Sequence, residues 1–271
     1  MEESMSLKDS HALVTGSSRG IGRGIALKLA QAGVKVAVHY YQNEAAAKQT
    51  LAMVRDRGSD GFVVQADVSK PEQISRLFKD VQSQFGKLEI LVSNARPELA
   101  EFYRPPMDIS LEHWRKALDS QAQAFLLEAQ MAAAIMPDGA RIVAISYSPS
   151  GRTGSWQPWV AMGAAKAALD ALVRYFAVAL GKRGITVNVI SPGATDDSVV
   201  SRLPTEVFSA IRAWHESGWT PMGRIGTPAD IGNAVVLLCR DEAGFITGQT
   251  IHVDGGASIM DSVFPLNIQQ G

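Results

Sequence analysis

The chain has 271 residues, of which 46% are hydrophobic and 20% are charged, and 26 basic against 27 acidic residues leave a formal net charge of −1. This composition is typical of a globular protein, and the balanced charge argues against nucleic acid or an anionic membrane surface as a partner. The single cysteine, Cys239, excludes an intrachain disulfide framework and a cysteine-rich metal site. The first ten residues, "MEESMSLKDS", contain no apolar run, and no apolar run elsewhere approaches the ~18 residues of a membrane span. We therefore expect a cytoplasmic protein that does not bind membranes.

Short runs rich in Val and Ile alternate with longer helical patterns along the chain. The predicted strands cover residues 11–16, 35–40, 62–67, 88–94, 141–146, 185–191 and 249–255. The predicted helices cover residues 20–32, 43–57, 70–85, 111–136, 159–182 and 228–240. Apolar strands that alternate with helices indicate a parallel sheet buried on both faces. We predict one α/β domain over residues 1–256, built on a doubly wound seven-stranded sheet, and a C-terminal tail at 257–271.

Two of the predicted helices begin with capping signals. Ser69 and Glu72 have the spacing of a capping box, and Thr227 stands as a cap before the first-turn Pro228. In a doubly wound sheet, ligands bind outside the carboxyl ends of the strands. The residues that directly follow each strand are therefore the candidates for a site.

The first crossover contains a glycine pattern that is typical of dinucleotide binding. Gly16, Gly20 and Gly22 are spaced G-x-x-x-G-x-G between the first strand and the first helix. Glycines allow the backbone to approach a pyrophosphate, and the helix N-terminus offers amide donors to it. Ser18 and Ile21 belong to the same turn and are included among the predicted cofactor contacts.

The residues near the second strand indicate which dinucleotide is bound. That strand ends in "HYYQN" with no acid before Glu44, so an acidic ribose ligand of the NAD type is missing. Arg19 lies in the glycine turn, where its guanidinium can pair with a 2′-phosphate. We therefore expect NADP(H), with Tyr40 and Asn43 near the phosphate. The alternative is a solvated Arg19 and a packing role for Tyr40.

Several motifs carry a resemblance to the short-chain dehydrogenase/reductase family over nearly the whole chain. They are Thr15-Gly16-Ser17-Ser18-Arg19-Gly20-Ile21-Gly22, Ala66-Asp67-Val68, Asn94-Ala95, Lys166 and Pro192-Gly193. The resemblance implies a Rossmann fold, a nicotinamide cofactor held by these motifs with Thr195, and a homotetramer packed through two long helices. Asp67 then contacts the adenine amino group, although an ordinary turn aspartate explains it as well.

The chain departs from the family where the catalytic tyrosine is expected. Most ketone reductases of the family have it four residues before the lysine, a position that is Met162 here. The enoyl-thioester reductase branch, which the chain resembles, has the pattern Tyr-x-x-Met-Gly-x-x-Lys. Residues 159–166 read "WVAMGAAK", so Trp159 replaces the tyrosine of that branch. Gln121 stands in place of the family's helix asparagine, seven residues after Trp114.

These departures favour a reaction that needs no strong acid. By the resemblance, Lys166 holds the nicotinamide ribose and Ser146 is the catalytic serine. The Trp159 indole has an N–H donor but no titratable proton, so it steadies an oxyanion or forms the floor of an apolar pocket. Ketone reduction requires a proton for the alkoxide, whereas conjugate reduction collects charge on a thioester oxygen that a donor can stabilise. Tyr147 is the substitute acid, unless it merely anchors a loop.

The segment 195–225 has more apolar bulk than a surface loop requires. It contains Leu203, Val207, Phe208, Ile211, Trp214, Trp219 and Met222. We expect a lid over an apolar substrate that also contacts Trp156 and Met162, although a helix packed on the core is the alternative. The five histidines lack metal-ligand spacing, and we predict no metal site. Apolar residues of the tail suggest docking on a neighbouring subunit.

The sequence therefore predicts an NADPH-dependent oxidoreductase that reduces an activated C=C bond of an apolar small molecule, with an enoyl thioester as one option. A second reading is an imine or ketone reductase that uses Tyr147 as its acid. A third is a family member that binds NADP without turnover, which the missing tyrosine motivates.

Overall fold

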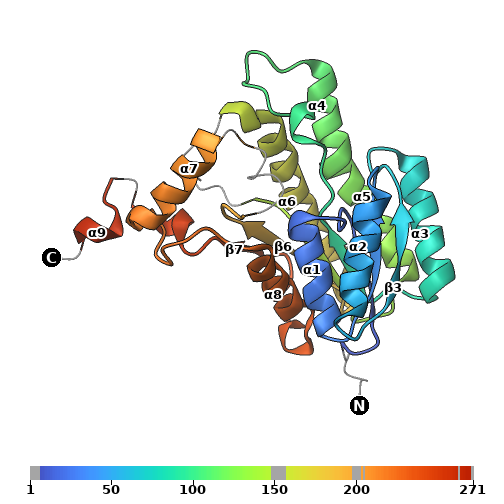
Figure 1. Ribbon diagram of the computed structural model, residues 1–271. Helices are drawn as coiled ribbons and strands as arrows, with labels where there is room; N and C mark the ends of the chain where they lie inside the picture. The colour runs from blue at the N-terminus through green and yellow to red at the C-terminus, as the bar shows by residue number, and fades with distance from the viewer. Residues whose placement is uncertain (1–6, 148–156, 197–202, 204, 262, 270–271) are drawn as a thin grey trace.

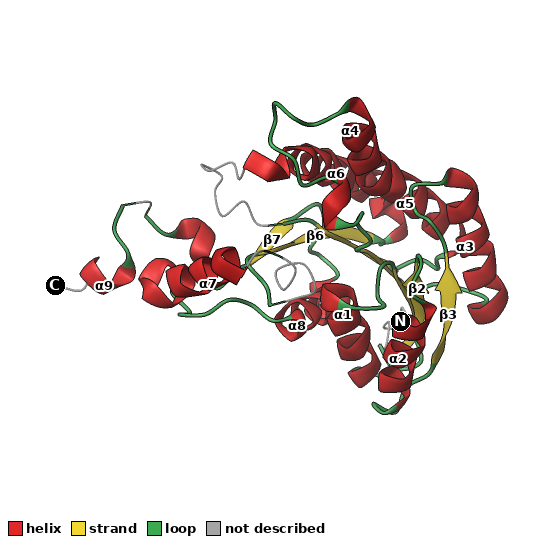
Figure 2. Cartoon of the chain, turned by 45° about the horizontal axis from the view of Figure 1, so that its top comes forward, coloured by secondary structure: helices red, strands yellow, loops and turns green. Residues whose placement is uncertain are grey.

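The computed structural model describes residues 7–147, 157–196, 203, 205–261 and 263–269. It confirms the predicted fold class, because the described strands form one parallel sheet of seven strands in the order β3-β2-β1-β4-β5-β6-β7. Figures 1 and 2 show the sheet between its flanking helices, with β3 at the right. The strands are β1 (His11–Val14), β2 (Lys35–Tyr40), β3 (Gly61–Gln65), β4 (Ile90–Ser93), β5 (Arg141–Ile145), β6 (Thr186–Pro192) and β7 (Thr250–Val253).

Helices connect the strands and cover both faces of the sheet. They are α1 (Gly20–Gln31), α2 (Glu44–Arg55), α3 (Pro71–Phe85), α4 (Leu111–Leu118), α5 (Ala124–Ile135), α6 (Val160–Leu180), α7 (Thr205–Trp214), α8 (Pro228–Cys239) and α9 (Leu266–Gln269). The predicted helix 111–136 contains a π-helical turn, η2 (Asp119–Gln123), which joins α4 to α5. Within the described ranges, no helix combines the length and the apolar character that crossing a membrane requires.

The hydrophobic core has two halves, one on each face of the sheet. Helices α1, α2 and α8 pack on one face, and α3, α5 and α6 pack on the other (Figure 2). Fully buried side chains such as Leu29 and Leu169 contribute about 1.5–3 kcal/mol each. Cys239 lies in the half that contains α1, α2 and α8. Burial raises the pKa of its thiol to about 12, so it packs as an apolar residue.

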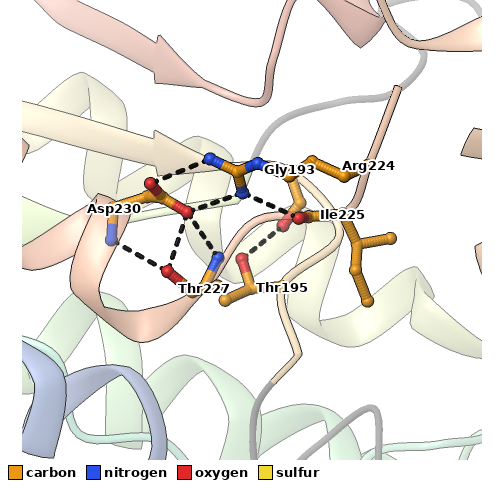
Figure 3. Close-up of polar contacts among 6 residues, drawn as sticks. All are labelled: Gly193, Thr195, Arg224, Ile225, Thr227 and Asp230. Carbon is orange, nitrogen blue, oxygen red and sulfur yellow. Dashed lines mark hydrogen bonds and ion pairs between the residues drawn. The ribbon is translucent and has the colours of Figure 1, made fainter. Parts of the chain in front are cut away.

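One of the two predicted helix caps is present in the structure, and the other is not. In α8, Thr227 Oγ1 accepts from the Asp230 amide at 3.2 Å, and Asp230 Oδ2 accepts from the Thr227 amide at 2.8 Å (Figure 3). In α3, the N-cap is Lys70, without a side-chain cap. The predicted capping box at Ser69 is wrong, because its hydroxyl donates to Asp67 Oδ1 at 2.7 Å instead.

A buried histidine joins the end of β2 to the first crossover. His39 is 2% exposed, and its Nδ1 accepts from the Gly16 amide at 2.8 Å while Nε2 donates to the Ala66 carbonyl at 3.1 Å. Both bonds require the neutral ring. Burial lowers the pKa of His39 to about 4, although the Ala66 carbonyl and Asp67 favour the charged form. The shape of the glycine turn therefore depends on an uncharged imidazole.

This arrangement predicts a pH-dependent stability. The folded state disfavours the imidazolium, so the contribution of His39 is complete above its unfolded pKa near 6.5 and is lost as the pH falls toward 4. Between these limits the free energy of unfolding falls by about 3 kcal/mol more in the wild type than in His39→Gln. Urea unfolding at pH 4.5 and pH 7 measures the difference. His113→Gln, at a more exposed histidine, is the control, and equal pH dependence of wild type and His39→Gln would contradict the prediction.

Candidate active site

A cavity of about 2110 Å³ runs along the carboxyl ends of the strands. Its size exceeds the ~300–1,000 Å³ of a typical small-molecule site, so it can hold a dinucleotide and a second molecule. Of the residues predicted from the sequence, it is lined by Gly16, Ser18, Arg19, Ile21, Gly22, Tyr40, Asn43, Asp67, Val68, Asn94, Ala95, Ser146, Tyr147, Trp159, Met162, Lys166, Pro192, Gly193, Thr195 and Trp214. Gly20, Gln121 and Trp219 are not part of this lining, and Trp156 falls outside the described residues.

The glycine turn is held by the loop after β4. Asn94 Nδ2 donates to the Thr15 and Gly16 carbonyls at 2.8 and 3.2 Å, and Thr15 Oγ1 accepts from the Asn94 amide at 2.9 Å. A Cβ on Gly22 would lie 2.4 Å from the Gly16 carbonyl oxygen, so a larger residue cannot fit. Gly20 has a φ of +56° and begins α1. The open N-terminus of α1 therefore faces the cavity, as phosphate binding requires.

The predicted adenosine contacts come from the glycine turn and from the residues that follow β2 and β3. Arg19 forms an ion pair with Glu98, a residue of the loop after β4. Asn43 caps α2 by accepting from the Ala46 amide at 2.9 Å. One carboxylate oxygen of Asp67 accepts from the Ser69 amide and hydroxyl at 2.9 and 2.7 Å. Asp67 thus makes the turn that its alternative interpretation expects, and it also lines the cavity.

Gln121 supports the site from behind. It lies in the π-helical turn and is 2% exposed. Its Nε2 donates to the Ala95 carbonyl at 3.0 Å and to the Ser120 carbonyl at 2.8 Å. The side chain therefore fixes the loop after β4, which carries Asn94 and Ala95.

Lys166 lies on α6 and is 7% exposed. Its Nζ donates to the Ile145 carbonyl at the end of β5. Burial lowers the pKa of Lys166 to about 8, with Asp170 and Glu128 favouring the ammonium and Arg96 disfavouring it. The ammonium thus remains the main form at neutral pH and lies in the cavity lining with Ser146, Tyr147 and Trp159.

Sequence reasoning missed Glu128, which lies on α5 and is 1% exposed. Burial raises its pKa to about 7, while contacts with the Ser93 and Thr15 hydroxyls and the charge of Lys166 favour the carboxylate. Its Oε2 has no hydrogen-bond partner within the described part of the chain. The signal in the sequence is an acid inside the apolar run 124–135.

Ser146 and Tyr147 follow β5 on the same side as Lys166. The Ser146 hydroxyl contacts Asp170, which sequence reasoning also missed, although it lies one helical turn after Lys166. A Cβ on Gly163 would lie 2.9 Å from the Tyr147 hydroxyl, so the phenol reaches the first turns of α6. Burial and the negative charge of Asp170 raise the pKa of Tyr147. The phenol therefore holds its proton more tightly than a free tyrosine does.

Trp159 belongs to an aromatic cluster at the start of α6. Its ring packs edge-on against Phe102 at 5.0 Å between centroids, and against Tyr103 and Tyr147 at 6.2 and 6.5 Å. Met162 is 2% exposed in the same cluster. Both residues line the cavity, so the wall beside Lys166 is largely apolar.

Described parts of the predicted lid, among them Thr195, Leu203 and several residues of α7, line the cavity. Thr195 Oγ1 donates to the Gly193 carbonyl at 2.9 Å, and Arg224 binds Asp230 nearby (Figure 3). Trp214 of α7 lines the cavity and stacks on Trp219, with ring centroids 5.6 Å apart and planes at 4°. Residues 197–202 and 204 of the predicted lid lie outside the described residues.

Comparisons with known proteins agree with this geometry. The family model described as Enoyl-(Acyl carrier protein) reductase matches residues 16–258. The 1-cyclohexenylcarbonyl-CoA reductase of Streptomyces collinus is 37% identical over 254 residues, which are 93% of this chain and 88% of that protein.

Two solved structures have a similar fold and sequence. The promiscuous reductase LugOII, which catalyses keto-reduction at C1 during lugdunomycin biosynthesis, is 34% identical with a TM-score of 0.84 over 94% of this chain and 100% of its own. The angucycline C-6 ketoreductase LanV with bound NADP is 33% identical with a TM-score of 0.84 over 94% of this chain and 98% of its own. The chain belongs to the short-chain dehydrogenase/reductase family, and the family model that covers most of it is that of the enoyl-(acyl carrier protein) reductases.

Proposed function

We propose that the protein is an NADPH-dependent reductase of an activated C=C bond, with an apolar enoyl thioester as its substrate class. The observation that supports this most is the wall beside Lys166. Trp159 and Met162 occupy the positions where the two branches of the family have a tyrosine, and Tyr147 is held neutral by burial and by Asp170. The site therefore keeps the Lys166 ammonium, whereas its phenol, Tyr147, is a weak acid.

The cavity fits a nicotinamide dinucleotide. The N-terminus of α1 and the glycine turn suit a pyrophosphate, and Arg19 with Tyr40 and Asn43 suits a 2′-phosphate. Lys166 at the other end suits the nicotinamide ribose. When bound, NADPH supplies the hydride.

The residues of the site then stabilise the negative charge that develops on the substrate. Hydride addition to the β-carbon of an enoyl thioester places negative charge on the thioester oxygen, and the α-carbon can take its proton from water. The Lys166 ammonium supplies positive potential in a cavity that the apolar Trp159 and Met162 shield from water. A 1-cyclohexenylcarbonyl-CoA reductase among the relatives supports an apolar, cyclic or short acyl group.

Ketone reduction is the second candidate, because LugOII and LanV are ketoreductases. In this reaction the alkoxide needs a proton, and Tyr147 is the phenol on this wall of the cavity within the described residues. Its raised pKa makes it a poor donor, which favours the first candidate.

We further propose that residues 195–225 form the substrate lid, with Trp214 facing the substrate and Trp219 supporting it. The tail 257–271 is then a separate element that follows the reductase domain. The exposed Val263, Phe264 and Ile268 suit docking on another subunit of a homotetramer.

Cofactor choice gives the first test. A charge-assisted hydrogen bond contributes about 1.5–3 kcal/mol, so Arg19→Gln should raise the Kd for NADPH by about 10- to 100-fold. The Kd for NADH should stay unchanged, because NADH lacks the 2′-phosphate. Fluorescence titration of both cofactors measures the effect, and equal losses for both would show that Arg19 does not contact this phosphate.

The variant Tyr147→Phe tests whether the Tyr147 phenol donates a proton in the reaction. Reduction of crotonyl-CoA should lose less than about threefold in kcat/KM, because no phenol proton is needed, whereas ketone reduction through Tyr147 would lose ~10²–10⁴-fold. NADPH oxidation with crotonyl-CoA, a cyclic imine and a cyclic ketone separates the readings, with Tyr175→Phe on the exposed face of α6 as the control. Tight NADPH binding without turnover on any substrate would instead support the non-catalytic reading.

The pH dependence tests Lys166. Its ammonium form exists below its pKa of about 8, so kcat/KM with crotonyl-CoA should decrease above that pH. Above pH 8 the Glu128 carboxyl, with a pKa of about 7, is ionised and favours the Lys166 ammonium. Glu128→Gln should therefore lower the pH at which kcat/KM begins to decrease. Rate profiles of the wild type and of Glu128→Gln from pH 6 to 10 measure both effects, with Glu72→Gln, at an exposed acid of α3 outside the cavity, as the control. An unmoved profile in Glu128→Gln would contradict the coupling.

A further inference from the structure

An ion pair spans the crevice in which the cofactor is proposed to bind. Arg19 belongs to the glycine turn after β1, and Glu98 belongs to the loop after β4. These two strands are neighbours in the sheet, but the helices that follow them pack on opposite faces (Figure 2). The crevice between β1 and β4 is therefore the switch point of the sheet, where doubly wound folds bind their ligands.

The carboxylate of Glu98 is held in place for this pair. Glu98 is the N-cap of the short 3₁₀ helix η1 (Leu99–Glu101), and its side chain accepts from the Glu101 amide. In return, Glu101 Oε2 accepts from the Glu98 amide at 3.1 Å, and Glu101 also pairs with Lys116 of α4. Arg19, Glu98, Glu101 and Lys116 all line the cavity.

We propose that Glu98 sets the cofactor preference of this protein by competing with the 2′-phosphate of NADPH for Arg19. This inference rests on the proposed function, in which Arg19 binds that phosphate. When NADPH binds, the Arg19 guanidinium exchanges one anion for another. Glu98 keeps the Glu101 amide as a partner, so its carboxylate is not left without a hydrogen bond. NADH has no phosphate at this position and leaves the ion pair unchanged.

The expected change in the Kd for NADPH follows from the exposure of the Arg19–Glu98 pair. The Arg19 and Glu98 side chains are 33% and 45% exposed, and ion pairs at such positions are weak. Glu98→Gln should therefore lower the Kd for NADPH by about two- to fivefold. The Kd for NADH should stay unchanged, so the preference for NADPH increases. The new amide can still accept from the Glu101 amide, which preserves η1.

The experiment measures the Kd of NADPH and of NADH by fluorescence titration for four proteins: wild type, Glu98→Gln, Arg19→Gln and the double variant. In the double variant, Glu98→Gln should have no effect, because the residue for which Glu98 competes is absent. Glu72→Gln removes an exposed acid of α3 that does not line the cavity and should leave both Kd values unchanged. Thermal unfolding checks that each variant is folded.

The outcomes separate the two proposals. If Arg19→Gln weakens NADPH binding but Glu98→Gln does not tighten it, the competition is wrong and the cofactor proposal stands. The competition is also wrong if Glu98→Gln acts equally on both cofactors or acts without Arg19. If Arg19→Gln leaves NADPH binding unchanged, the phosphate contact fails and the competition fails with it.

Discussion

The burial of one ammonium group is the constraint on which the proposed chemistry depends. Lys166 leaves water almost completely, and a buried charge needs compensation from its surroundings. The Ile145 carbonyl accepts its hydrogen bond, and carboxyl groups from two helices, Glu128 of α5 and Asp170 of α6, favour its charge. The end of β5 and the first half of α6 therefore form one electrostatic unit around the lysine.

In the proposed function, that unit serves the reaction although Trp159 and Met162 stand at the tyrosine positions of the family pattern. In the family pattern the lysine lowers the pKa of a phenol, whereas here the neighbouring phenol, Tyr147, faces Asp170 and has a raised pKa. The positive potential of Lys166 remains available to a developing oxyanion. On the proposed function, these surroundings stabilise charge on the substrate, and no proton is transferred from Tyr147.

Much of this organisation is predictable from the sequence. The alternation of strands and helices predicted the parallel sheet, and the rule for carboxyl ends of strands placed most of the candidate residues along one cavity. These predictions succeed because they depend on local patterns that are regular over many residues. The π-helical turn at 119–123 breaks such a pattern, and the continuous periodicity of 111–136 does not reveal it.

What the sequence does not reveal are contacts between residues that are far apart in the chain. The Arg19–Glu98 pair joins residues that are 79 positions apart, and no spacing rule connects them. Glu128 reads as one polar residue in an apolar helix until the fold brings it to Thr15 and Ser93. Ser69 has the spacing of a cap, but the nearer Asp67 takes its hydroxyl. In each case a tertiary or competing contact decides the role.

The packing of the last helix restricts which residue can stand at position 218. Asn267 Nδ2 donates to the Ser217 carbonyl at 3.3 Å, and a Cβ on Gly218 would lie 2.9 Å from Asn267 Oδ1. Helix α9 thus packs on the π-helical turn η6 (His215–Trp219), away from the sheet (Figure 1). A side chain at Gly218, whose φ is +93°, would therefore strain this turn and press against Asn267 of α9.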